Sequence, residues 1–165
     1  MDLLVSGDGT ARFADSIFRC ALGRGGLSPA KREGDGATPI GTWPLRRLLY
    51  RPDRIALPPT GLPATPIGPA DGWCDAADDR NYNLPVILPY PASAEALWRE
   101  DAVYDLIVPL GYNDGPILPG GGSAIFLHLA RDGYLATEGC VALARADLLA
   151  YLAVATPSSR VIVTP

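Results

Sequence analysis

Glycine and proline interrupt the whole chain, and they constrain its fold more than any other feature of the sequence. The 165 residues include 18 glycines and 17 prolines, which are spread along the chain rather than gathered in one linker. Because both residues break regular structure, they divide the chain into short segments. Short segments joined by turns are typical of a β-rich fold. With no internal repeat and no low-complexity tract, residues 1–165 are expected to form a single domain.

Apolar runs between these turns predict the strands. One run, Ile125-Phe126-Leu127-His128-Leu129, is nearly all apolar, as expected for a strand that is buried on both faces. His128 is therefore predicted to lie at the end of a central strand. The six expected strands are Leu3–Val5, Ser16–Leu22, Trp43–Tyr50, Tyr104–Leu110, Ser123–Leu129 and Arg160–Thr164.

Two helices are also expected. Ser93 is a suitable N-cap for a short helix over Ala94–Asp101. An apolar stripe at helical spacing predicts a longer helix over Arg145–Ala155, which Pro157 stops. The proline-rich segment Pro58–Pro69 is expected to be an ordered loop that crosses the surface.

Charge and hydropathy restrict the partners and the location of the chain. Its net charge of −4, without a basic patch, argues against nucleic acid, since proteins bind nucleic acid largely by neutralising phosphates. Residues 1–7 lack the basic start and long apolar stretch of a secretory signal, and no stretch is apolar enough to span a bilayer. By sequence alone, a cytoplasmic location is expected. The oligomeric state is left open.

The three cysteines are Cys20, Cys74 and Cys140. An odd number at wide spacing is not a disulfide framework, although one disulfide plus one free thiol stays open. His128 is the sole histidine, and no pair of cysteines has zinc-site spacing, so no metal site is expected. Cys20 lies in the middle of an expected strand with period-two apolar neighbours, which predicts a buried and inert side chain.

The segment from His128 to Cys140 is the strongest candidate for chemistry. A strand that ends in histidine is followed by a loop and then by Thr137-Glu138-Gly139-Cys140. An imidazole that accepts the thiol proton makes a cysteine nucleophilic, and Gly139 lets the backbone approach a substrate closely. Isolated cysteines more often pack as small apolar residues, so these residues alone leave both interpretations open.

Two blocks of the sequence together resemble the L,D-transpeptidase catalytic domain of the YkuD type. In that family a histidine on a strand is followed by Ser/Thr-His-Gly-Cys, which His128 and Thr137-Glu138-Gly139-Cys140 match in part. Far upstream, residues 34–43, Gly-Asp-Gly-Ala-Thr-Pro-Ile-Gly-Thr-Trp, match the family's Gly-Asp-x-x-Thr-Pro-x-Gly-x-Phe block. The resemblance implies a single β-rich α+β domain, in which a mixed curved sheet surrounds a catalytic cleft and is accompanied by one or two short helices.

On this resemblance, Cys140 is the nucleophile, His128 is the general base, and Gly139 shapes the turn and the oxyanion site. In the upstream block, Thr38, Pro39 and Gly41 would be architectural, with Gly41 in a tight turn before the next strand. The family's reaction would be transfer of an acyl group from a peptidoglycan stem peptide through a thioester, without a cofactor. The substrate would place the protein in the periplasm or cell wall.

Two alternatives share this resemblance. Water instead of an amine would resolve the same thioester in an L,D-carboxypeptidase, and a catalytically weak cell-wall-binding module would keep only the fold. A papain-type protease is disfavoured, since there the cysteine precedes the histidine along the chain.

Several positions depart from the family or lie outside its motifs. Glu138 stands where a second histidine is usual, Ala142 stands where many members have Arg or Asn, and the histidine-to-cysteine interval is short. Arg131 and Arg145 are candidates to replace the missing cation. Thr137 and Glu138 are expected to contact substrate, as are three residues from two other loops: Trp73, Tyr112 and Asn113. For Trp73 a purely structural role in the core is the alternative, and either Tyr112 or Asn113 is a candidate to orient His128.

Overall fold

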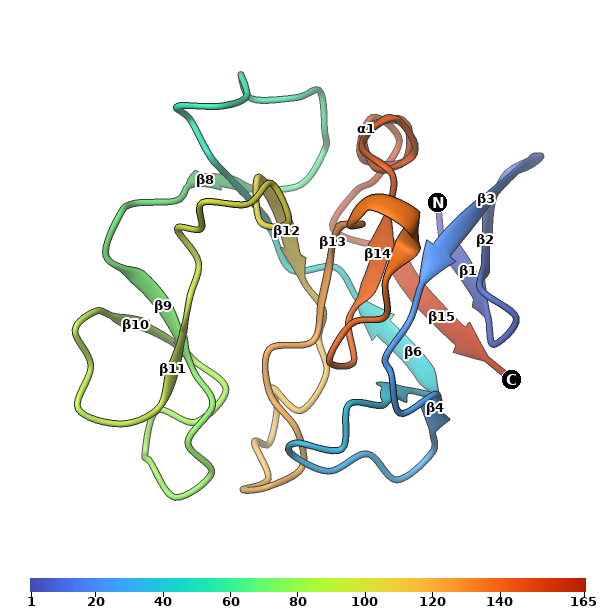
Figure 1. The fold of residues 1–165 in the computed structure, drawn as a ribbon. Helices are drawn as coiled ribbons and strands as arrows, with labels where there is room; N and C mark the ends of the chain where they lie inside the picture. The colour runs from blue at the N-terminus through green and yellow to red at the C-terminus, as the bar shows by residue number, and fades with distance from the viewer.

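The computed structural model describes all of residues 1–165, and short strands make up nearly all of its regular structure (Figure 1). The elements other than strands are the helix α1 (Arg145–Leu152) and the short 3-10 helix η1 (Asp132–Tyr134). The strands are β1 (Leu3–Ser6), β2 (Thr10–Phe13), β3 (Ser16–Ala21), β4 (Leu27–Ser28), β5 (Thr38–Pro39), β6 (Gly41–Pro44), β7 (Leu48–Tyr50), β8 (Ala64–Pro66), β9 (Asp71–Cys74), β10 (Pro85–Ile87), β11 (Ala94–Ala96), β12 (Leu106–Pro109), β13 (Phe126–Leu129), β14 (Val141–Leu143) and β15 (Arg160–Thr164).

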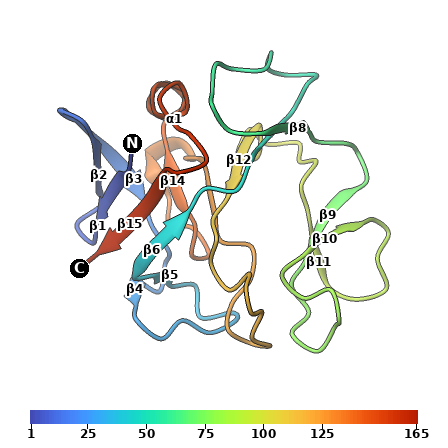
Figure 2. The same ribbon diagram turned by 180° about the vertical axis from the view of Figure 1, so that it is seen from behind.

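A ten-stranded mixed sheet forms the body of the domain, in the order β6-β15-β1-β2-β3-β14-β13-β12-β7-β8. The β1–β15 and β13–β14 pairs are parallel, as is β7–β8. Figure 2 shows β6 beside β15 on the back of the molecule. The sheet curls so far that the residue after β6, Leu45, forms an antiparallel bridge with Leu110, the residue after β12. The expected β-rich fold with a curved mixed sheet is confirmed.

The main core lies inside this curl. Alternate residues of the strands point inward, among them Leu127 and Leu129 of β13 and Val141 and Leu143 of β14, and all four are buried. Helix α1 adds apolar side chains to the same cluster, including the fully buried Tyr151. Each of these large side chains contributes about 1.5–3 kcal/mol through burial, and their density leaves β13 and β14 little freedom to shift.

A second apolar cluster lies on the outer face of the same strands. The three-stranded sheet β10-β9-β11 stands apart from the main sheet in Figure 1, and its Trp73 packs edge-on against Phe126 of β13. Tyr104 also meets Phe126, and the cluster includes Cys140. Because both faces of β13 are covered, all four of its residues are buried, as the apolar run predicts.

Several of the expected elements differ in the structure. Trp43–Tyr50 is not one strand but two, β6 and β7, because the chain crosses from β15 to β12 between them. Pro44 ends β6, and Leu45 bridges to Leu110 at the crossing. Pro58–Pro69 is a loop except for β8, which pairs with β7.

The helix expected over Ala94–Asp101 is absent, because residues 94–96 form β11. Glu95 lies opposite Trp73 of β9 in an antiparallel ladder. A segment of eight residues has little intrinsic helical stability, so pairing with a neighbouring strand outweighs the favourable cap at Ser93. The second helix is present, although α1 ends at Leu152 rather than at Ala155.

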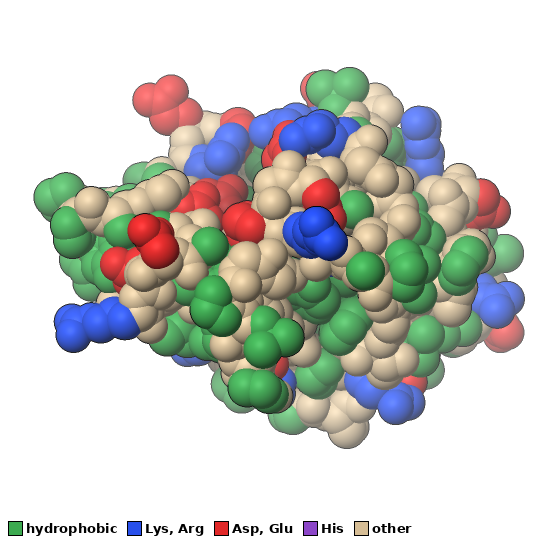
Figure 3. All heavy atoms as spheres, turned by 90° about the horizontal axis from the view of Figure 1, so that it is seen from below, with side chains coloured by type: hydrophobic (Ala, Val, Ile, Leu, Met, Phe, Trp, Pro, Cys, Tyr) green, Lys and Arg blue, Asp and Glu red, His purple; other side chains and the backbone are tan.

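The surface mixes charged and apolar groups. On the face shown in Figure 3, basic and acidic side chains are scattered among apolar ones and form no continuous basic area. None of the helices combines the length and the apolar character that crossing a bilayer requires.

Candidate active site

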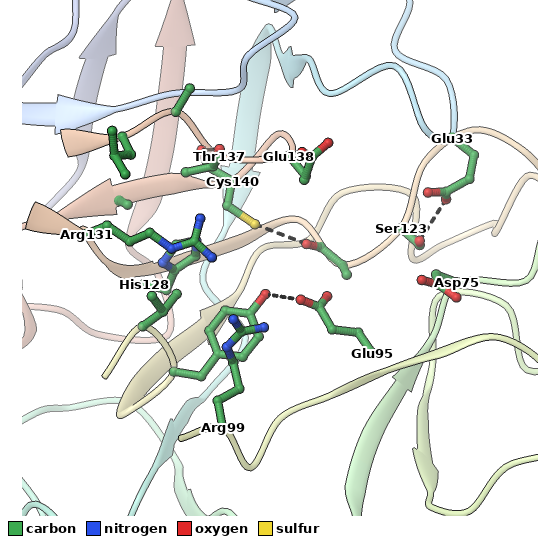
Figure 4. Close-up of a pocket in the computed structure, with 16 residues that line it drawn as sticks. Glu33, Asp75, Glu95, Arg99, Ser123, His128, Arg131, Thr137, Glu138 and Cys140 are labelled. Carbon is green, nitrogen blue, oxygen red and sulfur yellow. Dashed lines mark hydrogen bonds between the residues drawn. The ribbon is translucent and has the colours of Figure 1, made fainter. Parts of the chain in front are cut away.

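A cavity of about 410 Å³ opens beside the outer face of β13 and β14. Cys140 and His128 both contribute to its wall. The close-up in Figure 4 shows that charge is divided across the cavity: Arg99 and Arg131 lie on the side of His128. On the other side of Cys140 lie the carboxylates of Glu33, Asp75 and Glu95, with Glu138 at the rim.

The register of two parallel strands brings the histidine and the cysteine to the same face. His128 of β13 is paired with Ala142 of β14, and Cys140 precedes Ala142 by two residues. Because side chains alternate along extended backbone, residues two positions apart point to the same face. Cys140 and His128 therefore face the cavity together, while Leu127 and Val141 point into the main core.

His128 is a buried imidazole with a defined tautomer. Its Nδ1 lies 2.9 Å from the carbonyl oxygen of Leu129, which only accepts, so Nδ1 carries the hydrogen and Nε2 is left with a free lone pair. The ring packs edge-on against Tyr104, with 5.3 Å between centroids. Burial lowers the pKa of His128 to about 4, so the ring is neutral at physiological pH. A backbone carbonyl therefore orients the ring, and neither Tyr112 nor Asn113 does.

The thiol of Cys140 is also neutral. It donates a hydrogen bond to the carbonyl oxygen of Ala124 at 3.2 Å and accepts one from the amide of Phe126 at 3.3 Å. Burial and the neighbouring Glu95 carboxylate raise the pKa of Cys140 to about 12. No hydrogen bond joins Cys140 to His128 in this structure, because the thiol points toward the carbonyl oxygen of Ala124. Figure 4 shows the thiol of Cys140 directed away from His128.

The turn before Cys140 is fixed by one hydroxyl and one glycine. Thr137 Oγ1 donates to the carbonyl oxygen of Cys140 at 2.7 Å and accepts the amide hydrogen of Gly139 at 3.1 Å. Gly139 has φ +129°, and a Cβ added to it would lie 2.7 Å from the carbonyl oxygen of Ala37. The Gly139 amide is therefore occupied and not free to hold an oxyanion, whereas the Cys140 amide donates no hydrogen bond within the protein.

The loop that receives the thiol hydrogen is held by Asn83. Ala124 has φ +51°, a left-handed conformation that side chains disfavour, and its amide donates to Asn83 Oδ1 at 3.0 Å. The same oxygen accepts from Trp73 Nε1 at 3.0 Å. Asn83 Nδ2 donates to the carbonyl oxygens of Tyr112 and Asn113, at 3.1 and 2.9 Å.

Three residues expected to contact substrate are thus not in the cavity wall. Trp73, Tyr112 and Asn113 meet at Asn83 behind the wall, where they support the backbone around Ala124. Trp73 is part of β9, and the side chains of Tyr112 and Asn113 donate hydrogen bonds to carbonyl oxygens of residues 118–122. Trp73 follows the structural alternative, with its ring in the second apolar cluster.

The upstream block packs beneath the turn. The buried hydroxyl of Thr38 accepts the amide hydrogen of Gly23 at 2.8 Å, and Pro39 accepts from Trp43 Nε1 at 3.0 Å. Gly41 begins β6 rather than occupying a turn before it, and its lack of a side chain makes room for Trp43, whose ring would lie 2.4 Å from an added Cβ.

The two departures from the family motif have different surroundings. Glu138 points out of the rim of the cavity, where both of its oxygens accept from Arg24 Nε at 2.9 Å. Ala142 is buried in the cavity wall, opposite His128 in the sheet. Of the two candidate cations, Arg145 is bound to Asp105 and is not in the wall, whereas Arg131 lines the cavity.

Sequence reasoning missed the acidic side of the cavity. Glu95 accepts a 2.5 Å hydrogen bond from Tyr104, and Glu33 accepts from Ser123 and from the hydroxyl of Tyr82. Glu33 directly precedes the upstream block at residues 34–43, so its place beside a family motif is a feature of the sequence that indicates it. The local sequence does not indicate Glu95 as a site residue, because it predicts a helix over Ala94–Asp101 and gives no partner for that helix.

The other two cysteines stay outside the site. Cys20 and Cys74 are both buried with free thiols, and neither lines the cavity. Burial raises the pKa of Cys20 to about 12, in agreement with the inert side chain expected from the sequence.

Taken together, the fold and the cavity define a β-rich domain in which two adjacent parallel strands present a histidine and a cysteine to one pocket. A sequence model of the L,D-transpeptidase catalytic domain, YkuD, matches residues 3–163. The chain therefore belongs to the L,D-transpeptidase catalytic domain family, as the two sequence blocks predict.

Two solved structures are similar to the chain at low sequence identity. The structure of Bdellovibrio bacteriovorus Bd1075 has a TM-score of 0.47 and 15% identity, over 99% of this chain and 47% of that one. The L,D-transpeptidase from Mycobacterium smegmatis has a TM-score of 0.43 and 14% identity, over 99% of this chain and 58% of that one. The chain thus spans about half the length of these two proteins. No curated protein sequence matches it.

Proposed function

We propose that the protein is a cysteine L,D-transpeptidase that transfers acyl groups of peptidoglycan stem peptides through a thioester on Cys140. The observation that carries this proposal is the placement of Cys140 and His128 on one face of adjacent parallel strands, in the wall of a single cavity. Membership of the YkuD family supports the reaction class. The substrate lies in the cell envelope, so the proposal places the protein in the periplasm or cell wall.

Acylation would begin from a neutral pair. Since burial lowers the pKa of His128 and raises that of Cys140, a thiolate–imidazolium pair is disfavoured before substrate binds. The thiol rotates from Ala124 toward Nε2 of His128, which takes its proton while Sγ forms a bond to the peptide carbonyl carbon. The carbonyl electron pair moves onto oxygen. When the C–N bond breaks, His128 returns the proton to the departing amine, and a thioester is left on Cys140.

The developing oxyanion needs donors that are free. The amide of Cys140 donates no hydrogen bond within the protein, and Cys140 lines the cavity, so this amide would supply one hydrogen bond. The Gly139 amide would contribute only if its bond to Thr137 were released, so in this proposal Gly139 and Thr137 shape the turn.

The charged lining suits a peptide with both signs of charge. A stem peptide carries carboxylates together with the ammonium group of its diaminopimelate residue. Arg131 and Arg99 would attract a carboxylate on the His128 side, and the carboxylates beyond Cys140 would attract an ammonium group. Arg131 would thus take the role of the cation that many relatives carry in place of Ala142.

The proposal is tested by labelling with a carbapenem, a β-lactam that acylates cysteines of this family, followed by intact mass. Wild type should gain one adduct, Cys140→Ala should gain none, and His128→Ala should react slowly. Cys74→Ala is the matched control, since it removes a buried thiol outside the cavity and should label like wild type. An unlabelled wild type, or equal labelling of Cys140→Ala, would contradict the proposal and favour a non-catalytic wall-binding module.

Product analysis then separates transfer from hydrolysis. Wild type is incubated with a stem tetrapeptide, with and without an acceptor amine. A cross-linked product that depends on the acceptor indicates transpeptidation, which is the expected result. Release of D-alanine with only a free tripeptide, even at high acceptor concentration, would instead make the protein an L,D-carboxypeptidase.

A further inference from the structure

Lys31 is a buried lysine that takes no part in the reaction steps proposed for Cys140 and His128. Its side chain is only 3% exposed, and Nζ forms an ion pair with Asp35 Oδ1 at 2.8 Å. Asp35 also accepts the amide hydrogens of Arg32 and Ala37, at 2.7 and 2.8 Å. Although burial alone would raise the pKa of Asp35, the hydrogen bond from Lys31 and the two amides lower it, so the carboxylate stays ionised. The ammonium is therefore held in one place.

That place is directly behind the turn that carries the nucleophile. Lys31 runs between two glycines with left-handed backbone, Gly122 and Gly139. A Cβ on Gly122 would lie 2.9 Å from Lys31 Cε, and a Cβ on Gly139 would lie 3.2 Å from Lys31 Nζ. Gly122 leads into the loop with Ala124, which receives the thiol hydrogen, and Gly139 precedes Cys140. The glycines leave the space that the lysine side chain fills.

Lys31 and the nearby carboxylates have opposite effects on the pKa of the Cys140 thiol. Burial raises the pKa of Cys140 most, the carboxylates of Glu95 and Glu138 raise it further, and Lys31 lowers it. The other cations near the cavity have different positions. Arg131 and Arg99 lie on the side of His128, and Arg145 is bound to Asp105 outside the wall.

We propose that Lys31 is a positioning residue whose ammonium, held by Asp35, stabilises negative charge on Cys140 and on the intermediate that forms there. The inference rests on Cys140 as the nucleophile of the proposed function. It assigns to residues 31 and 35 an electrostatic role that the sequence motif alone does not give, and this role is separate from the one proposed for Arg131 in binding substrate.

The experiment measures the rate at which iodoacetamide alkylates Cys140, by peptide mass spectrometry, as a function of pH in wild type and variants. Only the thiolate reacts, so the rate at a given pH follows the apparent thiol pKa. Lys31→Met should slow alkylation about tenfold, which corresponds to a pKa shift of about one unit for loss of a nearby opposite charge. Asp35→Asn leaves the ammonium without its counter-charge and should accelerate alkylation by a similar factor.

The opposite signs separate charge from structural damage, because loosening of the site would accelerate alkylation in both variants. Arg32→Met is the matched control, since it removes the adjacent but exposed cation and should leave the rate unchanged. Circular dichroism establishes that each variant is folded. If Lys31→Met does not fold, Lys31→Gln, which keeps a polar end without the charge, takes its place and should also slow alkylation. An unchanged or slower rate in Asp35→Asn, or a faster one in Lys31→Met, overturns the proposal. A wild type that carbapenems do not acylate would refute the proposed function, while this series would still decide the role of Lys31.

Discussion

Gly139 shows how a single position satisfies both backbone and packing requirements of the site. Its φ of +129° is a conformation that other residues rarely adopt, and the carbonyl oxygen of Ala37 lies where a Cβ would be. In the same turn, the amide of Gly139 donates a hydrogen bond to Thr137 Oγ1. The glycine of the Gly-Cys motif is therefore required because the upstream block packs against it, in addition to any part that it takes in catalysis.

Gly139→Ala should be strongly destabilising. The left-handed backbone and the contact with Ala37, 2.7 Å from the added Cβ, should together cost about 3 kcal/mol or more in free energy of unfolding. Urea denaturation followed by fluorescence measures the change. Gly133→Ala is the matched control in the same loop, since its φ is +74° but its Cβ would meet nothing within 4 Å. It should lose only about 1 kcal/mol. Equal losses in the two variants would refute the packing argument.

At the scale of elements, the sequence predicts strands well where a pattern is local. The strand Arg160–Thr164 and the start of the helix at Arg145 agree with the structure. Residues 94–96 form a strand instead of the predicted helix because they pair with β9, which lies about twenty residues earlier in the chain. Likewise the break between β6 and β7 depends on Leu110, far away in sequence. Partners at long range decide these segments, and local propensity does not contain them.

The attachment of the three-stranded sheet to the main sheet centres on Asn83. Its side chain makes four hydrogen bonds that connect β9, the loop at residues 112–113 and Ala124. It is 5% exposed, so a group that loses its bond to Asn83 has little access to water. The loop with Ala124 contacts the thiol of Cys140, so this link between elements also fixes the site.

Asn83→Ala should therefore lower the free energy of unfolding by about 3–5 kcal/mol, because it leaves the indole of Trp73, the amide of Ala124 and two carbonyl oxygens without partners. It should also accelerate alkylation of Cys140 by loosening Ala124. Asn81→Ala is the control in the same loop, since it loses a side-chain bond to Tyr90 and should cost about 1 kcal/mol. If urea denaturation gave similar values for the two variants, Asn83 would not be the link described.

At the scale of the molecule, the sequence identifies the central pair but not its surroundings. His128 and Cys140 are close in sequence, and the parallel register that joins them is set by adjacent strands. The electrostatic environment comes from distant segments: Glu95 reaches the cavity from the smaller sheet, and Lys31 packs behind the turn at Gly139 from the segment between β4 and β5. No local pattern contains that arrangement, so the sequence predicts the proposed nucleophile better than the charged groups around it.

The burial of the sole histidine makes the stability of the whole molecule depend on pH. The folded pKa of His128 is about 4, below the value of 6.5 expected of an unfolded chain. Below pH 6.5 the unfolded state therefore binds a proton that the folded state does not, and stability falls as pH decreases toward 4. Carboxylates with lowered pKa, such as Asp35 and Asp101, add to the loss in the same direction.

A comparison of wild type with His128→Gln isolates the contribution of the histidine. Free energies of unfolding are measured in urea from pH 7 to pH 4. Because the carboxylates are common to both proteins, the difference between the two curves should change by about 3 kcal/mol in favour of the variant as pH falls, since burial lowers the pKa of His128 from 6.5 to about 4. The imidazole NMR signal of wild type should show no titration above about pH 5. Parallel curves, together with a signal that titrates near pH 6.5, would mean that His128 is solvated, and the neutral base required by the proposed mechanism would lose its structural support.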